Sequence, residues 1–240
     1  MKKTRWMVIG ALLIAGMVQA DVVTLDENSP TKVANWYAID NTNPADGIAN
    51  SGSGGNTNVL SFNVGQSAGN KLLRGALYFD VAGQDAITNA VLTVRLTGRA
   101  GGGTIGANPT YGLSLYAAAK SSLGVSTPAQ TSVAMMYDAD FVDTGLDLPK
   151  TSTSGWYSFD VTASVNAAAT NGGVAAFRFQ MDNDTSLAYG VNDYYAVAAF
   201  KDAAGNAPEL VLSTIPEPAT IGMLGIGAMT TLLVRKKCTL

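Results

Sequence analysis

The chain has 240 residues with a formal net charge of −3, one cysteine and no histidine. The lack of histidine excludes Ser-His-Asp and Cys-His catalysis and zinc sites with imidazole ligands. Residues 21–214 carry 17 acidic and nine basic side chains, a formal charge of −8, which argues against nucleic acid as a partner. The single cysteine is Cys238, so residues 21–214 form no disulfide and depend on a buried core.

Residues 1–20 predict a secretory signal peptide. Three basic residues within the first five positions precede an apolar stretch from Trp6 to Val18. This stretch is shorter than a membrane-spanning helix, and Gln19 and the small residue Ala20 lead from it to the polar Asp21, as in cleaved export signals. We predict cleavage between Ala20 and Asp21.

Residues 21–214 predict one all-β domain. Between Leu73 and Val81 every second residue is apolar or glycine, and Arg74, Tyr78 and Asp80 fall on the opposite side. Such alternation is typical of a strand with one buried face, and strands of this kind pack as an antiparallel β-sandwich. Similar alternation occurs in Ala90–Thr97, Leu113–Tyr116, Trp156–Val161 and Ala175–Met181, and a last strand begins at Leu210.

Three segments depart from this alternation. Val161–Ala169 is predicted to form a short helix with Thr162 as its N-cap. The polar stretch Asn41–Gly55 predicts a surface loop, and Ala139–Thr144 is a candidate strand.

Motifs for catalysis are sparse. Gly65–Gly69 and Gly101–Gly106 match short catalytic and nucleotide-binding patterns, but the helices and the histidine that those sites need are missing, so we interpret both as turns. Asp80 and Asp160 each occur in a Phe-Asp-Val segment. Paired carboxylates can hydrolyse glycosidic bonds, and the alternative is that each aspartate bonds a neighbouring loop at a strand end. We expect no catalytic residues and no required cofactor.

Arginines and aromatic residues on the non-core side of the strands are candidate carbohydrate contacts. Sugar rings stack on exposed aromatic faces, and guanidinium groups bind carboxylates. The alternative for each arginine is cross-strand pairing with an acidic residue. The candidates are Arg74, Tyr78, Arg95, Tyr116, Trp156 and Arg178.

Two clusters of aspartates are candidate sites for a structural calcium ion. Asp182 and Asp184 offer carboxylates at alternate positions after a predicted strand, and Asp193 follows nearby. Calcium takes about six to eight oxygen ligands, which loops can supply, and the alternative is plain Asp-rich turns. A second group consists of Asp138, Asp140 and Asp143.

Residues 215–240 form a tripartite tail. An acidic-proline motif precedes an apolar run from Ile221 to Val234, inside a membrane segment that we place at residues 219–234, and a basic cluster follows. As a helix the run spans about 21 Å, less than the hydrocarbon core of about 30 Å. The motif residues are Pro216, Glu217 and Pro218, and the basic cluster is Arg235, Lys236 and Lys237.

This order resembles the PEP-CTERM sorting signal. The resemblance implies recognition and processing by a membrane-embedded exosortase during export. The alternative is a retained single-span anchor whose basic end stays in the cytoplasm.

Five segments between Asn56 and Ser213 resemble, in their order, the DNRLRE-type, disaggregatase-related domain. The resemblance implies a jelly roll similar to a carbohydrate-binding module, and affinity for glycans. The segments are Asn56–Leu60 with Val64-Gly65, Leu72–Val81, Ala86–Val94, Gly155–Thr162 and Ala207–Leu212.

Three functions remain open. The first is an exported, exosortase-sorted protein of the cell surface or extracellular matrix, which passes through the inner membrane transiently and binds extracellular polysaccharide without catalysis. The second is a structural matrix or adhesion protein with no sugar site. The third is a polysaccharide-degrading enzyme that uses carboxylates alone.

Overall fold

The fold is given by a computed structural model that describes residues 21–25, 33–40, 51–54, 61–67, 71–84, 86–121, 139–184, 191–198 and 207–214. These residues form a sheet of 13 strands and the helix α2 (Thr162–Asn171). The signal peptide predicted at residues 1–20 and the tail at residues 215–240 lie outside the described residues. Among the described residues, no helix is both long and apolar enough to cross a bilayer.

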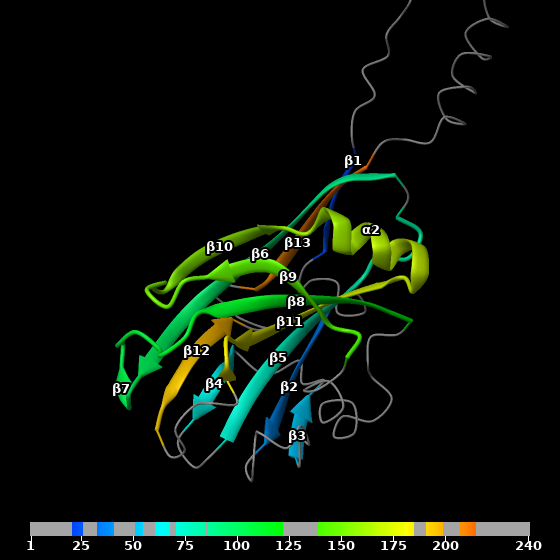
Figure 1. Ribbon diagram of the computed structural model, residues 1–240. Helices are drawn as coiled ribbons and strands as arrows, with labels where there is room; N and C mark the ends of the chain where they lie inside the picture. The colour runs from blue at the N-terminus through cyan, green and yellow to red at the C-terminus, as the bar shows by residue number, and fades with distance from the viewer. Residues whose placement is uncertain are drawn as a thin grey trace, which may run out of the picture.

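All described strand pairings are antiparallel, and the sheet curls into a half-barrel (Figure 1). The main path through the sheet is β1-β13-β6-β12-β4-β5-β11-β8-β9, with β10 and β7 on β6, and β2 on β5 and β3. The predicted antiparallel all-β fold is confirmed. The strands are β1 (Asp21–Leu25), β2 (Val33–Asp40), β3 (Ser51–Gly54), β4 (Ser61–Ser67), β5 (Lys71–Asp80), β6 (Ile87–Gly101), β7 (Thr104–Ile105), β8 (Leu113–Lys120), β9 (Val142–Leu148), β10 (Gly155–Asp160), β11 (Val174–Met181), β12 (Asp193–Ala198) and β13 (Glu209–Thr214).

The core lies on the inner face of the curled sheet. Alternate residues of β5, β6, β10 and β11 point inward, as the sequence pattern predicts, and the ring centroids of Phe79 and Phe177 are 6.1 Å apart in an edge-on arrangement. The remaining inner side chains are mostly aliphatic, and they include Leu77, Leu92, Val94, Leu96, Leu113, Leu115, Val197, Leu210 and Leu212. The half-barrel is therefore a packed layer and not an open shell.

Helix α2 covers one end of this core with Val165 and Ala168. The predicted helix is confirmed, but the predicted N-cap is wrong, because Val161 is the N-cap and Thr162 is the first helical residue. The amide and the hydroxyl of Thr162 donate instead to Asp160 Oδ1, at 3.1 and 2.6 Å. The same hydroxyl accepts a bond from the amide of Ala90 at 2.9 Å, which joins the helix start to β6.

Three local predictions need correction. Ser51–Gly54, predicted as part of a loop, forms β3, since its backbone pairs with β2 and a ladder requires no side chains. Residues 65–67, predicted as a turn, belong to β4. The candidate strand at Ala139–Thr144 is shifted, because β9 covers Val142–Leu148.

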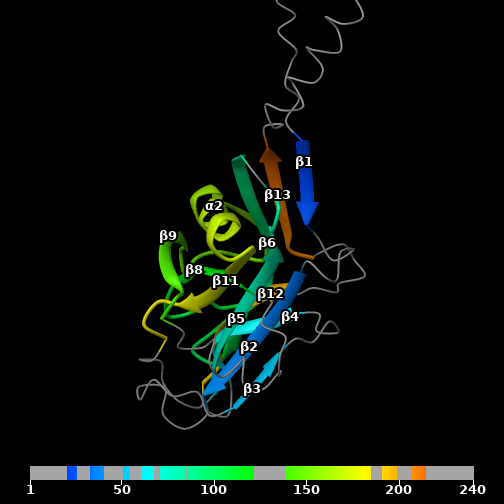
Figure 2. The ribbon, with the colours of Figure 1, turned by 90° about the vertical axis from the view of Figure 1, so that its right-hand side faces the viewer.

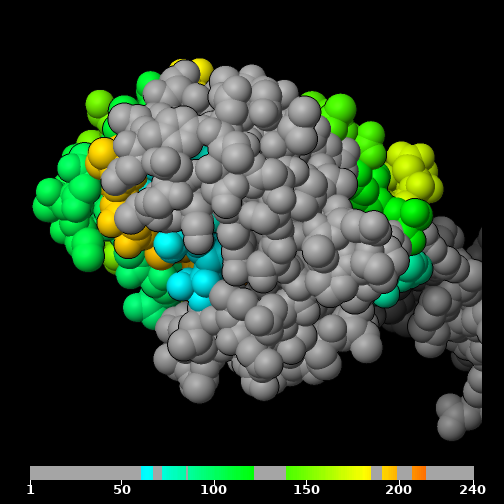
Figure 3. All heavy atoms as spheres, turned by 90° about the horizontal axis from the view of Figure 1, so that it is seen from below, coloured from blue at the N-terminus to red at the C-terminus, as the bar shows by residue number. Residues whose placement is uncertain are grey.

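The glycine-rich segment Gly101–Gly106 contains the predicted turn, in which Gly102 and Gly103 connect β6 to β7. Gly102 and Gly103 have φ values of +56° and +88°, a region that favours glycine. The amide of Gly103 donates to the carbonyl of Asn192 at 2.9 Å. The β6–β7 hairpin thus lies on the rim beside β12, as Figure 3 shows in green and orange.

The two ends of the described chain meet at one pole of the sheet. β1 pairs with β13 along its full length, from Asp21 opposite Thr214 to Leu25 opposite Leu210. Figure 2 shows the two strands side by side, with the start of β1 beside the end of β13.

Candidate functional site

The predicted carbohydrate-contact residues fall into two groups. Arg74, Tyr78 and Arg178 are all less than 10% exposed, on the outer face of β5 and β11. Arg95 and Trp156 lie on β6 and β10, and Trp156 is 49% exposed. The three arginines therefore do not converge on one surface, because Arg95 is separated from the other two by β12 and β4 in the sheet order.

Arg74 forms a bidentate ion pair with Asp184. Its Nε and Nη2 atoms donate to the two carboxylate oxygens at 2.7 and 2.8 Å, and both side chains are less than 10% exposed. A guanidinium fork that binds a carboxylate in this way fixes geometry as well as charge. The pair joins β5 to the segment after β11, so its role is structural.

Arg178 lies between two aromatic rings. Its guanidinium carbon is 5.2 Å from the ring centre of Tyr116, which is directly opposite on β8, and 4.7 Å from that of Phe141. Burial, followed by the charge of Asp143, raises the pKa of the Tyr116 phenol. Attraction between the guanidinium and the two rings offsets part of the free-energy cost of burying the cation.

The second group forms an exposed surface, which we call the Trp156 face and define as Thr93, Arg95, Trp156 and Ser158. Arg95 and Trp156 are directly opposite each other, with the guanidinium carbon 5.9 Å from the ring centre. Thr93 and Ser158 are the next opposed pair on the same side, and their hydroxyl oxygens are 3.0 Å apart. This surface combines an aromatic plane, a cation and two hydroxyls.

The strands below the Trp156 face are anchored in the core. Val94 and Phe159, on the inner side of the same two strands, are buried in the core. Tyr157 accepts a bond from the amide of Thr153 at 3.1 Å and donates to its carbonyl at 2.8 Å, which fixes the start of β10. The aromatic plane of Trp156 is therefore attached to an ordered backbone.

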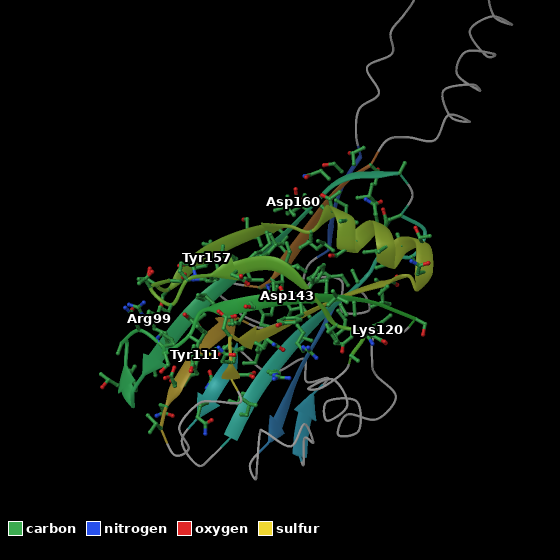
Figure 4. The ribbon with its side chains drawn as sticks, in the orientation of Figure 1. Arg99, Tyr111, Lys120, Asp143, Tyr157 and Asp160 are labelled. Atoms are coloured by element: carbon green, nitrogen blue, oxygen red, sulfur yellow. The ribbon has the colours of Figure 1, made fainter. Side chains whose placement is uncertain are left out.

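Arg99 ties the same end of the sheet together. Its Nη1 atom donates to the carbonyls of Thr151 and Ser152 at 3.2 and 2.7 Å, and its Nε atom donates to the carbonyl of Gly106 at 3.1 Å. Figure 4 shows Arg99 and Tyr157 at this end. Sequence reasoning missed the role of Arg99, and the only signal for it was its position just before the glycine-rich turn.

The three predicted calcium ligands, Asp182, Asp184 and Asp193, each interact with a different side chain. Asp182 accepts a bond from Ser114, and Asp184 binds Arg74. Asp193 accepts bonds from the amide and the hydroxyl of Thr110. Within the described ranges, no group of three His, Cys, Asp or Glu side chains is arranged to hold a metal ion.

The two described members of the second aspartate group also have different hydrogen-bond partners. Asp140 pairs with Lys120 at 2.7 Å, and this hydrogen bond lowers the pKa of the Asp140 carboxyl. Asp143 accepts a bond from the amide of Gly145 at 2.8 Å. The third member, Asp138, lies outside the described residues.

The two Phe-Asp-Val aspartates bond the backbone at strand ends. Asp80 accepts a bond from the amide of Ala82 at 3.0 Å, at the end of β5. Asp160 accepts bonds from Thr162, and these bonds lower the pKa of its carboxyl. Both carboxylates thus bond the chain just beyond the ends of their own strands.

Comparison with known proteins bears on the tail. The family model described as the PEP-CTERM protein-sorting motif matches residues 214–237, which include Pro216, Glu217, Pro218 and the basic cluster Arg235, Lys236 and Lys237. A search of curated proteins finds no match. The match places the chain among proteins that carry an export and sorting signal. That signal implies export to the cell surface through a membrane-associated step and is consistent with processing by an exosortase.

Proposed function

We propose that this exported surface protein is non-catalytic and associates with extracellular polysaccharide through the Trp156 face. The observation that carries the proposal is the half-exposed side chain of Trp156, which lies on β10 directly opposite Arg95. The half-exposed indole beside a guanidinium and two hydroxyls combines an apolar plane with polar groups at its edge.

The chemistry of the Trp156 face suits a sugar chain. An indole plane offers apolar contact for the CH groups of a pyranose ring, and its edge remains open to polar groups. Arg95 supplies hydrogen-bond donors that reach hydroxyl or carboxylate oxygens, and Thr93 and Ser158 supply further hydroxyls. The proposal includes a β-sandwich of the jelly-roll type, in line with the resemblance to the DNRLRE-type domain, and the curled antiparallel sheet is compatible with it.

The absence of catalysis is part of the proposal. A glycoside hydrolase needs a carboxylic acid that stays protonated near neutral pH, which requires a raised pKa. The pKa of Asp160 is shifted in the opposite direction by its bonds to Thr162. The sequence offers no histidine as a substitute. Structural calcium remains a prediction from the sequence, and the proposal does not depend on it.

Retardation of the processed, exported protein in native gels that contain polysaccharide tests the binding proposal. We expect slower migration in gels that contain the exopolysaccharide of the producing cells. No retardation on any neutral or acidic polysaccharide, with or without calcium, would favour the structural matrix protein without a sugar site. Steady release of reducing ends or unsaturated sugars would instead favour a degrading enzyme.

The sorting proposal has its own test. In the double variant Pro216→Ala/Glu217→Ala, the tail should remain attached and the protein should stay with the membrane fraction. Normal sorting and trimming of this variant would show that an exosortase does not read the motif.

A further inference from the structure

The paired ends of β1 and β13 form a structure that we call the end clasp, defined as Asp21–Leu25 with Leu210–Thr214. Each residue of β1 lies opposite one of β13. The other edge of β13 pairs with β6, so that Thr214 lies between Asp21 on one side and Ile87 on the other. The last residue of the described domain is therefore held inside a sheet and not at a loose end.

Further contacts hold the end of β13 in place. The hydroxyl of Thr88 donates to the carbonyl of Ser213 at 3.0 Å. The side chain of Asn166 on α2 donates to the carbonyl of Ile87 at 3.1 Å, which places the helix behind the strand that pairs with Thr214. Ile87 itself is buried in the core. The end of β13 thus has a strand on each side and a helix close by.

The sorting motif begins where this strand ends. The matched residues start at Thr214, which is still part of the ladder, and Pro216 is only two residues further along the chain. Two residues of extended chain reach at most about 7 Å. The cleavage site predicted for the signal peptide is equally close, because Asp21 is the first residue of β1. Only Ile215 therefore separates the sheet from Pro216 in the sequence, and no residue separates the predicted signal cleavage site from β1.

This short separation limits access for an enzyme. Peptide-binding clefts commonly take their substrate as an extended segment that donates and accepts backbone hydrogen bonds. Ser213 and Thr214, the last described residues before the motif, already pair with β1 and β6 in this way.

We propose that the end clasp is a gate, so that the end of β13 must leave the sheet before the tail is cut. The proposal rests on the processing of the tail given under the proposed function. The enzyme breaks a peptide bond in the tail with water or an amine as acceptor, and the clasp controls whether that bond is reachable. While β13 is paired with β1 and β6 the tail stays attached, and once the end of β13 has left the sheet the tail is removed.

A disulfide across the clasp tests the proposal in the full-length chain. Val22 and Ser213 lie directly opposite each other. Opposed residues of antiparallel strands have Cα atoms about 4.5–5.5 Å apart, within the range of about 4.4–6.8 Å that a disulfide accepts. The variant Val22→Cys/Ser213→Cys is made in a Cys238→Ser background, which leaves the two new cysteines as the only ones.

Trimming is followed in the producing cells by pulse-chase labelling and mass spectrometry. We expect the oxidised clasp variant to lose its tail at least about tenfold more slowly than the Cys238→Ser background, since the open state becomes rare. Reducing agent should restore the rate, and so should a short Gly-Ser linker after Thr214 in the oxidised variant. The linker result separates blocked access from misfolding.

A disulfide elsewhere provides the matched control. Ala117 and Val142 are opposed on β8 and β9, and Val142 is exposed. Ala117→Cys/Val142→Cys should be trimmed at the background rate. Equal trimming of the fully oxidised clasp variant and this control would overturn the gate. Two other results would instead overturn the proposed processing itself. One is that the Cys238→Ser background keeps its tail, and the other is that the Pro216→Ala/Glu217→Ala variant is trimmed normally.

Discussion

Arg74 and Asp184 are 110 positions apart in the sequence and form a bidentate ion pair in which both side chains are almost fully buried. A buried pair contributes little beyond what an apolar pair of the same size would contribute, but the loss of one partner leaves an uncompensated charge inside the protein. The two residues therefore depend on each other.

Asp184→Asn should destabilise the domain strongly. The variant keeps the shape of the side chain but removes the carboxylate that binds the buried guanidinium of Arg74 through two hydrogen bonds, at a cost of about 3–5 kcal/mol. Urea unfolding of the mature protein measures the loss. The double variant Arg74→Met/Asp184→Leu should recover most of it. A single variant within about 0.5 kcal/mol of the wild type, as for an ordinary surface change, would contradict the structural role.

Gly75→Ala should destabilise the core through overpacking. A Cβ atom at this position would overlap the ring of Phe62, which is buried and packs 6.2 Å from the ring of Phe179. Overpacking of this kind costs about 1–3 kcal/mol.

Gly98→Ala is the matched control for Gly75→Ala. Its Cβ would lie 3.7 Å from the Cβ of Ala196, an ordinary contact distance. Equal free energies of unfolding for the two variants would contradict the packing of Phe62 against Gly75.

Stability should fall in alkaline solution because of Tyr195. Burial raises the pKa of this phenol, and its hydroxyl donates to the carbonyl of Tyr111 at 3.2 Å. An unfolded tyrosine ionises near pH 10, so above about pH 10 the unfolded state releases a proton that the folded state retains. The stabilising contribution is thus complete below the unfolded pKa and is lost as the pH rises towards the folded one.

The variant Tyr195→Phe isolates this effect. The free energy of unfolding should fall less steeply between about pH 9 and pH 11 than in the wild type, since one titrating group is removed. Identical slopes for the two proteins would show that Tyr195 does not titrate with unfolding.

The alternation of apolar residues was sufficient to predict which residues of β5, β6, β10 and β11 form the inner face. Alternation in a single strand says only that Arg74 and Tyr78 point away from the core. Whether that outer side is solvent-exposed depends on contacts distant in sequence, such as that of Arg74 with Asp184. For this reason the burial of these two side chains could not be predicted.

Only part of the candidate site could be predicted. Arg95 and Trp156 were both proposed as sugar contacts, but their direct opposition depends on the register of β6 and β10, which spacing along the chain does not determine. The N-cap prediction was wrong for a related reason. Thr162 has the right chemistry for a cap, but its amide donates a hydrogen bond to Asp160, and its hydroxyl accepts one from the amide of Ala90.

Affinity electrophoresis of Trp156→Ala beside Val142→Ala tests the central claim most directly. Both positions carry exposed apolar side chains, but only Trp156 belongs to the Trp156 face. The account predicts that Trp156→Ala weakens binding to the exopolysaccharide at least about tenfold, equal to about 1.4 kcal/mol, while Val142→Ala binds as the wild type does. Equal retardation of wild type and both variants would contradict it.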